Sequence, residues 1–376
     1  MTRNGVLVTR RRLLAAAGVG GLALVKPAWA EGMIDLQLPG GPGARQITTS
    51  FPQKGPMILQ RTRPPLLETP LEVFDRGVST PNDQYVRWHI LHGLPSVQLS
   101  AVNQCSGNSR GFFQPRVPGG QWANGAMGNA LWKGVRLKNV LDKAGVKPGA
   151  VQVRFKGLEE PVVADAPHFM KSLDIDHARD GEVMIAYAMN GEQLPLVNGF
   201  PLRLVVPGWY ATYWVKMLND IEVLDQPDVN YWTKVAYTIP DTPHASIKPG
   251  ETDVKMIPIN RMVPRSFITN IAAVSKVKAG APTTLRGIAF GGDCGVASVD
   301  FSIDRGQSWH RTQLGKDEGK YGFRQWQTQL TLPAPGEYHL LIRCTNSNGV
   351  AQPDTPNWNP AGFMRNVMES INIIVA

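Results

Sequence analysis

Two segments determine the fold class predicted for this chain: NQCSGNSRGFF at residues 103–113 and NGAMGNALWKGVRLKNVLDKAG at residues 124–145. The first contains Cys105, one of only three cysteines in 376 residues, set between small and amide side chains. No second cysteine or histidine follows at the spacing of a zinc finger. These surroundings leave several chemical roles open for a solitary thiol.

Four roles compete for Cys105. A buried inert thiol is the simplest. A nucleophile needs a nearby base, and the seven histidines form no dyad motif. Haem attachment needs Cys-x-x-Cys-His, which the sequence does not contain. The fourth role is a single thiolate ligand to a soft or high-valent metal, whose other ligands come from an organic cofactor.

Several motifs agree in order along the chain and resemble the sulfite oxidase family, in its bacterial periplasmic sulfite dehydrogenase type. They are the two opening segments, YVRWH at 85–89, IAYAMNGEQLPLVNGFPLRLVVPGWYATYWVKMLNDIEV at 185–223, YWTKVAYTIP at 231–240, VDFSIDRGQSWHRTQL at 299–314 and QPDTPNWNPAGFMRNV at 352–367. The resemblance implies a molybdenum–molybdopterin cofactor with a single pyranopterin, to whose metal the Cys105 thiolate binds. The sequence has no Cys-x-x-Cys-His motif and no separate haem-binding domain, so we expect no haem in this chain.

The resemblance also places the cofactor-binding side chains. Arg203 and Lys216 fall where the family holds the pterin phosphate, and fixed positive charge suits a phosphate. Asn198 stands where many relatives have histidine; its amide still donates a hydrogen bond. The cofactor-binding residues implied in this way are Tyr85, His89, Cys105, Asn198, Arg203 and Lys216, with Cys105 as the metal ligand.

The catalytic residues implied by the resemblance are Arg87, Tyr237, His89 and Arg365. Arg87 would hold the sulfite anion through charge-assisted hydrogen bonds. His89, two residues away on an extended segment, would share the face of Arg87. Seventeen residues separate Arg87 from Cys105, fewer than in relatives. That short interval supports the alternative of a catalytically inactive periplasmic binding module.

The first 30 residues have the three parts of an export signal: Arg10-Arg11-Arg12, an apolar run at 15–25 and Ala28-Trp29-Ala30. The paired arginines indicate the twin-arginine route and hence a periplasmic protein. Eleven apolar residues are too few to span a bilayer. We therefore expect no membrane span.

Charge excludes one class of partner. Five of the 39 basic residues and no acidic ones lie in the first 30 residues, so 34 basic and 30 acidic residues remain from Glu31 onward. Basic patches interleaved with aromatic residues, typical of nucleic-acid binding, are absent from the sequence. A mildly positive surface suits a small anion such as sulfite.

The sequence predicts an α+β fold in two domains after the signal peptide at 1–30. Residues 31–246 would form the mixed molybdopterin-binding domain, with an extended arm to about residue 75 and a helix over 131–145 that Gly145 ends. Residues 247–376 have short alternating strands separated by turns, typical of an immunoglobulin-like β-sandwich. Cys294 and Cys344 are expected to be two buried thiols, with a disulfide as the alternative.

We therefore expect a periplasmic sulfite dehydrogenase that oxidises sulfite to sulfate. Without a haem motif the chain would pass electrons to an external c-type cytochrome, and the second domain would mediate a homodimer. The alternative enzyme is a molybdopterin-dependent reductase of S-oxides or oxyanions, because fold and cofactor alone do not set the direction of reaction.

Overall fold

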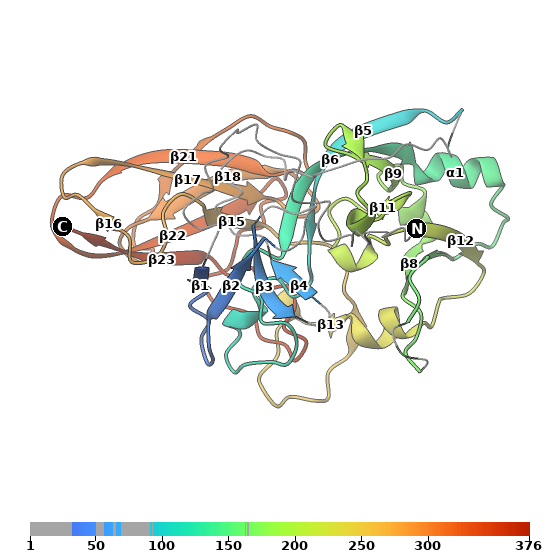
Figure 1. The fold of residues 1–376 in the computed structure, drawn as a ribbon, viewed down its shortest axis with the longest axis horizontal. Coiled ribbons are helices and arrows are strands. Elements are labelled where there is room, and N and C mark those ends of the chain that lie inside the picture. Colours follow the sequence, from blue (N-terminus) through green and yellow to red (C-terminus); the bar gives the residue numbers. More distant parts are fainter. Residues whose placement is uncertain are drawn as a thin grey trace, which may run out of the picture.

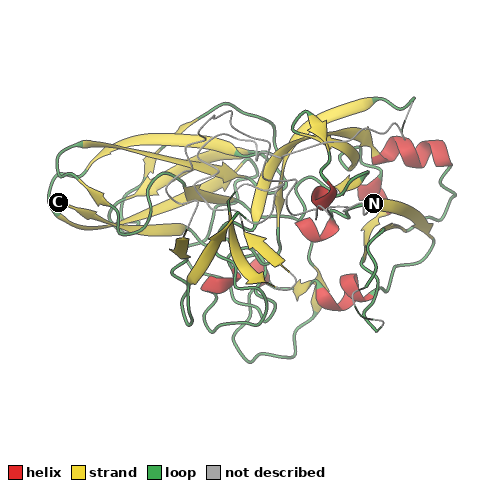
Figure 2. Cartoon of the chain, viewed as in Figure 1, coloured by secondary structure: helices red, strands yellow, loops and turns green. Residues whose placement is uncertain are grey.

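The computed structural model describes residues 32–49, 56–62, 65–68, 91, 93–161, 163 and 165–376. Strands dominate this part of the chain and helices are few and short, as Figure 2 shows. The strands of the C-terminal region, residues 256–376, lie at the left of Figure 1, and most of the N-terminal region lies at the right. The signal peptide prediction falls outside the described residues.

The central sheet of the N-terminal region has the strand order β10-β9-β6-β5, with β11 pairing to β9. Its strands are β5 (Ser96–Gln104), β6 (Met127–Arg136), β9 (Met184–Met189), β10 (Glu192–Gln193) and β11 (Arg203–Val205). The antiparallel β5–β6 register runs without a break from Ser96↔Val135 to Gln104↔Met127. That ladder places Cys105 directly beyond the last paired residue of β5.

A second sheet, in the order β12-β7-β8, completes the N-terminal core. Its strands are β7 (Gln152–Gly157), β8 (Met170–Asp174) and β12 (Leu218–Leu224), and β13 (Thr238–Pro240) pairs with β14 (Met256–Pro258). The helices are α1 (Leu137–Ala144) and α2 (Ile175–Ala178), the 3₁₀ turns η2 (Arg110–Phe112), η3 (Leu196–Asn198), η4 (Ala211–Tyr213) and η6 (Pro243–Ala245), and the π-helix η5 (Trp232–Ala236).

Two expectations for this region were wrong. The helix predicted over 131–145 begins only at Leu137, because residues 131–136 belong to β6, in which 131–135 pair with β5 and 132–136 pair with β9. Gly145 does end the helix, at φ 78°. The expected extended arm forms a four-stranded antiparallel sheet of β1 (Gly32–Asp35), β2 (Ala44–Thr48), β3 (Met57–Thr62) and β4 (Pro65–Glu68). Backbone pairing makes strands here despite the proline and glycine content.

The C-terminal region has two sheets that share one hydrophobic core. The first, in the order β15-β17-β21-β20, contains β15 (Arg265–Ile268), β17 (Pro282–Phe290), β20 (Gln313–Leu314) and β21 (Arg324–Thr331). The second, in the order β16-β23-β22-β18-β19, contains β16 (Lys276–Val277), β18 (Val296–Ser302), β19 (His310–Arg311), β22 (Gly336–Asn346) and β23 (Glu369–Val375). The alternating segments predicted by the sequence fall on β17 to β23, whereas β15 and β16 were not predicted.

The two regions share apolar contacts at their junction. Phe267, Phe290 and Phe363 from the C-terminal region belong to the same buried cluster as Ala101 and Val102 of β5. The Val102 amide donates to the Tyr321 carbonyl at 2.9 Å. The end of β5, and therefore the start of the Cys105 loop, is packed against both regions.

Cys294 and Cys344 are both buried and unbridged, as the sequence favoured. Burial raises the pKa of the Cys344 thiol, so it is an unreactive core residue. None of the described helices is long and apolar enough to cross a bilayer.

Candidate active site

The Cys105 loop is a tight turn held by its own backbone. The Cys105 amide donates to the Ala126 carbonyl at 2.9 Å, and the Cys105 carbonyl accepts from the Asn108 amide at 3.0 Å. The Asn108 side chain returns the link, since its Oδ1 accepts from the Ala126 amide at 2.9 Å. The thiol itself is half-buried. It is therefore both fixed in place and accessible to a ligand.

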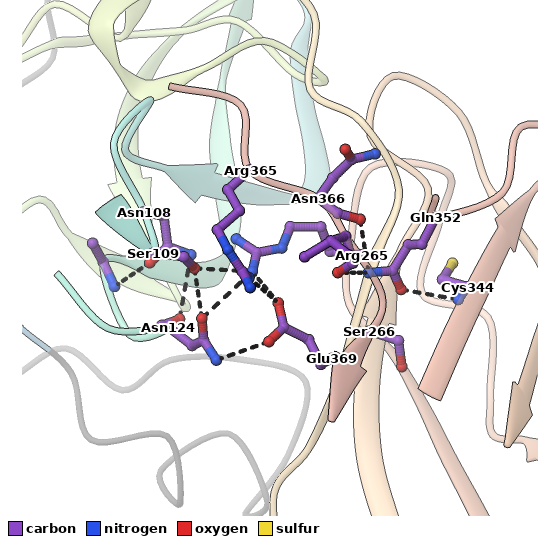
Figure 3. A network of polar contacts seen from close by, with 12 residues as sticks. Asn108, Ser109, Asn124, Arg265, Ser266, Cys344, Gln352, Arg365, Asn366 and Glu369 are labelled. Carbon is purple, nitrogen blue, oxygen red and sulfur yellow. Dashed lines mark hydrogen bonds and ion pairs between the residues drawn. The ribbon is translucent and has the colours of Figure 1, made fainter. Parts of the chain in front are cut away.

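A buried polar network from the C-terminal region reaches this loop (Figure 3). Arg265 of β15 donates to the Ser109 hydroxyl at 2.9 Å and pairs with the Glu369 carboxylate of β23. Asn124 donates to the other Glu369 oxygen at 3.3 Å. Ser109 has a φ of 70°, the left-handed region that non-glycine residues rarely adopt. The network thus holds a strained residue four positions after Cys105.

Two side chains from different elements, Arg110 of η2 and Tyr237 after η5, lie close enough to Cys105 for its charge to act on them. Burial raises the pKa of Tyr237, and the charge of the Cys105 thiolate raises it further. Burial lowers the pKa of Arg110, and Cys105 and Tyr237 oppose this by attraction. The Arg110 Nε donates to the Ala361 carbonyl at 3.0 Å, which fixes the guanidinium beside Phe363. A fixed cation and a phenol hydroxyl therefore share the neighbourhood of the thiol.

Arg110 was missing from the residues predicted by sequence. It lies inside the NQCSGNSRGFF segment, five residues after Cys105, so its position was visible. A single arginine in a glycine-containing loop reads equally well as a solvated charge. Only the fold shows that the Arg110 guanidinium is held at the Ala361 carbonyl, where the charge of Cys105 acts on it.

The predicted residues Asn198, Arg203 and Lys216 come together at a second point. Arg203 of β11 donates to the Asn198 carbonyl at 3.0 Å, and the Met217 amide donates to the Gly199 carbonyl at 3.2 Å, which brings the Lys216 segment alongside. Lys216 forms a half-exposed ion pair with Glu159 at 3.2 Å. Burial lowers the pKa of Arg203 to about 10, with Glu159 opposing, so the guanidinium stays charged at neutral pH. Glu159 therefore acts on both cations, which lie on neighbouring segments.

The remaining predicted residues are separated from these or not described. Tyr85, Arg87 and His89 lie outside the described residues. Arg365 joins the junction network, where it donates to Glu369 at 3.3 Å (Figure 3). Burial lowers the pKa of Arg365, while Glu369 raises it. The structure therefore places Arg365 beside a carboxylate that it shares with Arg265.

The polar atoms near Cys105 and at Arg203 fit a large polar cofactor. Within the described part of the chain, buried polar atoms without a hydrogen-bond partner include Asn103 Nδ2, Gln104 Oε1 and Ser106 Oγ next to Cys105, and Nε of Arg203. Buried polar groups are normally satisfied, so a bound group with its own donors and acceptors is the natural partner. No three His, Cys, Asp or Glu side chains of the described residues gather at a metal-binding distance. A metal here would rely on Cys105 and on non-protein ligands.

Comparison with known proteins identifies two domain families and several relatives. The family model "Oxidoreductase molybdopterin binding domain" matches residues 71–232, and the model "Mo-co oxidoreductase dimerisation domain" matches residues 256–376. Mitochondrial sulfite oxidase of Macaca fascicularis is 32% identical over 301 residues, which cover 76% of this chain and 54% of that protein. Sulfite oxidase of Arabidopsis thaliana is 30% identical over 300 residues, which cover 73% of this chain and 75% of that protein.

Among solved structures, the sulfane dehydrogenase SoxCD from Paracoccus pantotrophus has the same fold, with a TM-score of 0.67, 21% identity and 87% of each chain covered. The chain spans about half the length of the mammalian sulfite oxidases it matches. Fold, site and matches define a two-domain molybdopterin oxidoreductase. Within that class, the chain belongs to the sulfite oxidase family.

Proposed function

We propose that this protein is a periplasmic sulfite dehydrogenase, which oxidises sulfite to sulfate and passes the electrons to an external c-type cytochrome. The observation that carries the proposal is the half-buried Cys105 thiol, faced by Arg110 and Tyr237 and flanked by buried polar atoms without partners in the described residues. A thiol in that setting suits a metal whose other ligands are not protein, and the nearby cation suits an anionic substrate.

The residues of the chain have separate tasks in this proposal. Arg203, Lys216 and the Asn198 segment hold the anionic end of the pterin, and Cys105 holds the metal. Arg110 and Arg87 supply positive charge for sulfite, while the Tyr237 hydroxyl donates a hydrogen bond to an anionic oxygen. His89, Tyr85 and Arg365 complete the site as the family resemblance implies. When bound, the molybdenum–pterin group supplies the two-electron redox chemistry, and the protein positions and charges the site.

Further proposals follow from the second domain and the leader. Residues 1–30 direct the protein to the twin-arginine route, residues 31–246 form the cofactor domain, and residues 247–376 form a sandwich of immunoglobulin type. The match of residues 256–376 to a dimerisation domain supports a homodimer. We keep the cytochrome acceptor and the absence of a haem in this chain as parts of the same proposal.

The test is metal content together with substrate choice. Protein from a host that makes molybdopterin should contain about one molybdenum per chain. It should reduce cytochrome c with sulfite, and reduce neither methionine sulfoxide nor nitrate with an artificial electron donor at a comparable rate. A sulfane substrate is the third arm, given the fold shared with SoxCD.

The outcomes separate the candidates. Faster reduction of S-oxides or nitrate than oxidation of sulfite would make the protein a reductase. Folded protein that contains no molybdenum would support the alternative of a catalytically inactive binding module. Turnover with a sulfane and none with sulfite would keep the cofactor and change the substrate.

A further inference from the structure

Lys171 is a fully buried lysine in the second sheet of the N-terminal region. It belongs to β8, in which Lys171, Ser172 and Leu173 are all buried, and its own exposure is 0%. Lysine is among the residues least often buried without a partner, because the ammonium group loses its hydration. A role for Lys171 must therefore be sought in what surrounds its ammonium group.

The ammonium group lies between one carbonyl and two aromatic rings. Its Nζ donates to the Trp232 carbonyl at 3.0 Å. It also lies 4.4 Å from the ring centroid of Tyr213 and 5.3 Å from that of Tyr237. No carboxylate of the described residues lies within ion-pair distance of it. The faces of two tyrosines thus take the place of a counter-ion, as in a cation–π site.

The carbonyl that Lys171 binds belongs to the turn that presents Tyr237. Trp232 begins the π-helix η5, which ends at Ala236, directly before Tyr237. The Trp232 indole donates to the carbonyls of Pro167 and His168, so the segment before β8 binds the side chain of the residue whose carbonyl Lys171 binds. Such wide turns are rare and occur often at functional sites. On the other side, the Tyr237 ring stacks on Phe363 at a centroid distance of 5.8 Å.

Burial makes the charge of Lys171 conditional on pH. Desolvation lowers its pKa to about 7, with Asp228 opposing. Asp228 is largely occupied by other partners, namely the Ser172 hydroxyl, Asn230 and Arg154. The elements packed against β8 are β7, α2, η4 and η5. Three titratable groups of these elements and their flanking residues act on Lys171: Tyr213, Tyr237 and Asp228. Arg154 pairs with Asp228, and the charge of Asp174 acts on Tyr213.

We propose that Lys171 is a positioning residue for Tyr237: it fixes the turn before Tyr237 and places its ammonium group against the Tyr237 ring. A cation at the ring face draws electron density from the phenol and strengthens its hydroxyl as a donor to an anionic oxygen. Binding of the anionic substrate should therefore be stronger when Lys171 is protonated. The inference rests on the proposed sulfite oxidation for its effect on turnover, but not for the charge state of Lys171.

The first test compares kcat/KM for sulfite in the holoenzyme with that of Lys171→Met, at several values between about pH 6 and 9. Sulfite itself changes protonation in this range, so the quantity to follow is the ratio of wild type to variant at each pH. We expect this ratio to fall by roughly three- to thirty-fold as pH rises, the factor that corresponds to a cation–π interaction. A ratio independent of pH would overturn the proposal.

Two further variants make this test decisive. Lys133→Met changes an exposed lysine of β6 and should give a ratio to wild type that does not vary with pH. Lys171→Arg keeps the charge at every pH used and should lose less activity than wild type above pH 7. If Lys171→Met does not fold, the arginine variant decides alone, and a wild-type pH profile in it contradicts the proposal.

A second test needs no cofactor and no substrate. Between about pH 7 and the ordinary lysine value of 10.5, the unfolded chain binds the proton that folded Lys171 has lost. The free energy of unfolding of the wild type should therefore rise with pH in that window, and this rise should be missing in Lys171→Met. Equal slopes would overturn the proposal. If no variant turns over sulfite, the proposed function fails while this comparison still decides the charge of Lys171.

Discussion

Arg265 and Lys171 are both fully buried near the Cys105 site, but their charges are held in different ways. Arg265, at the junction of the two regions, pairs with Glu369 and donates to Ser109. Lys171, in the interior of the N-terminal region, meets a carbonyl and two tyrosine rings. Arg265 therefore has a carboxylate partner in the C-terminal region and a hydrogen bond to Ser109 of the N-terminal region, whereas Lys171 has no carboxylate partner among the described residues.

The difference separates structure from function. A buried ion pair with further hydrogen bonds is costly to break on one side, so the Arg265–Glu369 pair, which also contacts Ser109 and Asn124, fixes the Cys105 loop. A buried lysine without a carboxylate gives up its proton near neutrality. We infer that the junction sets where the thiol lies, whereas the interior sets how strongly the site attracts an anion.

The largest effect is expected from a change of Cys105 itself. Replacing Cys105 by serine exchanges a soft thiolate for a hard, poorly ionised hydroxyl and changes the metal's surroundings. In the proposed function Arg203 and Lys216 would still hold the pterin, so we expect Cys105→Ser to retain much of its cofactor. Turnover of sulfite should fall by about a thousand-fold or more, measured with cytochrome c beside the molybdenum content. Turnover at the native rate would remove Cys105 from the site.

The second prediction concerns Glu369→Gln, which would leave Arg265, like Lys171, buried without a carboxylate partner. Glu369→Gln leaves Arg265 buried and without its carboxylate, so unfolding should become easier by about 3–5 kcal/mol. Denaturant unfolding monitored by tryptophan fluorescence measures this directly. As a matched control, Asp241→Asn removes the partner of Lys255 in an exposed pair and should cost no more than about 1 kcal/mol. Equal effects of the two changes would show that Arg265 does not depend on Glu369.

A smaller effect is expected from changing Asp228, the acidic residue whose charge acts on Lys171. Asp228→Asn removes the one charge that raises the pKa of Lys171, so this pKa should fall further. The pH at which the unfolding free energy begins to rise should move down by about one unit, since the same linkage applies. Asp220→Asn, on the exposed part of β12, serves as the control and should leave that pH unchanged. An unchanged pH in Asp228→Asn would mean that solvent already screens this charge.

Much of the site could be predicted because its residues lie close together in sequence. Asn198, Arg203 and Lys216 fall within one segment, and the strands of the C-terminal region follow their alternating pattern because one face of each sheet is buried. The helix predicted over 131–145 was too long because the contacts that make residues 131–136 a strand are distant in sequence. Residues 131–136 are held by partners about 30 and 50 positions away, which a local pattern does not contain.

Lys171 and Arg265 escaped prediction for the same physical reason. Each is a single basic residue whose neighbours come from distant segments: Trp232 lies 61 positions after Lys171, and Ser109 lies 156 positions before Arg265. In sequence, a lone cation reads as a solvated surface charge. Only burial, which is a property of the whole fold, turns it into part of a site.

The link between Asn124 and Glu369 joins residues 245 positions apart and has a consequence for the order of assembly. The Cys105 loop obtains its last polar contacts only when β23 has been synthesised and paired with β22. Until then Arg265 has no carboxylate partner, and the loop that carries the thiol is incomplete. With Cys105 as the proposed metal ligand, we expect the metal to be loaded late in maturation, after β23 has paired with β22.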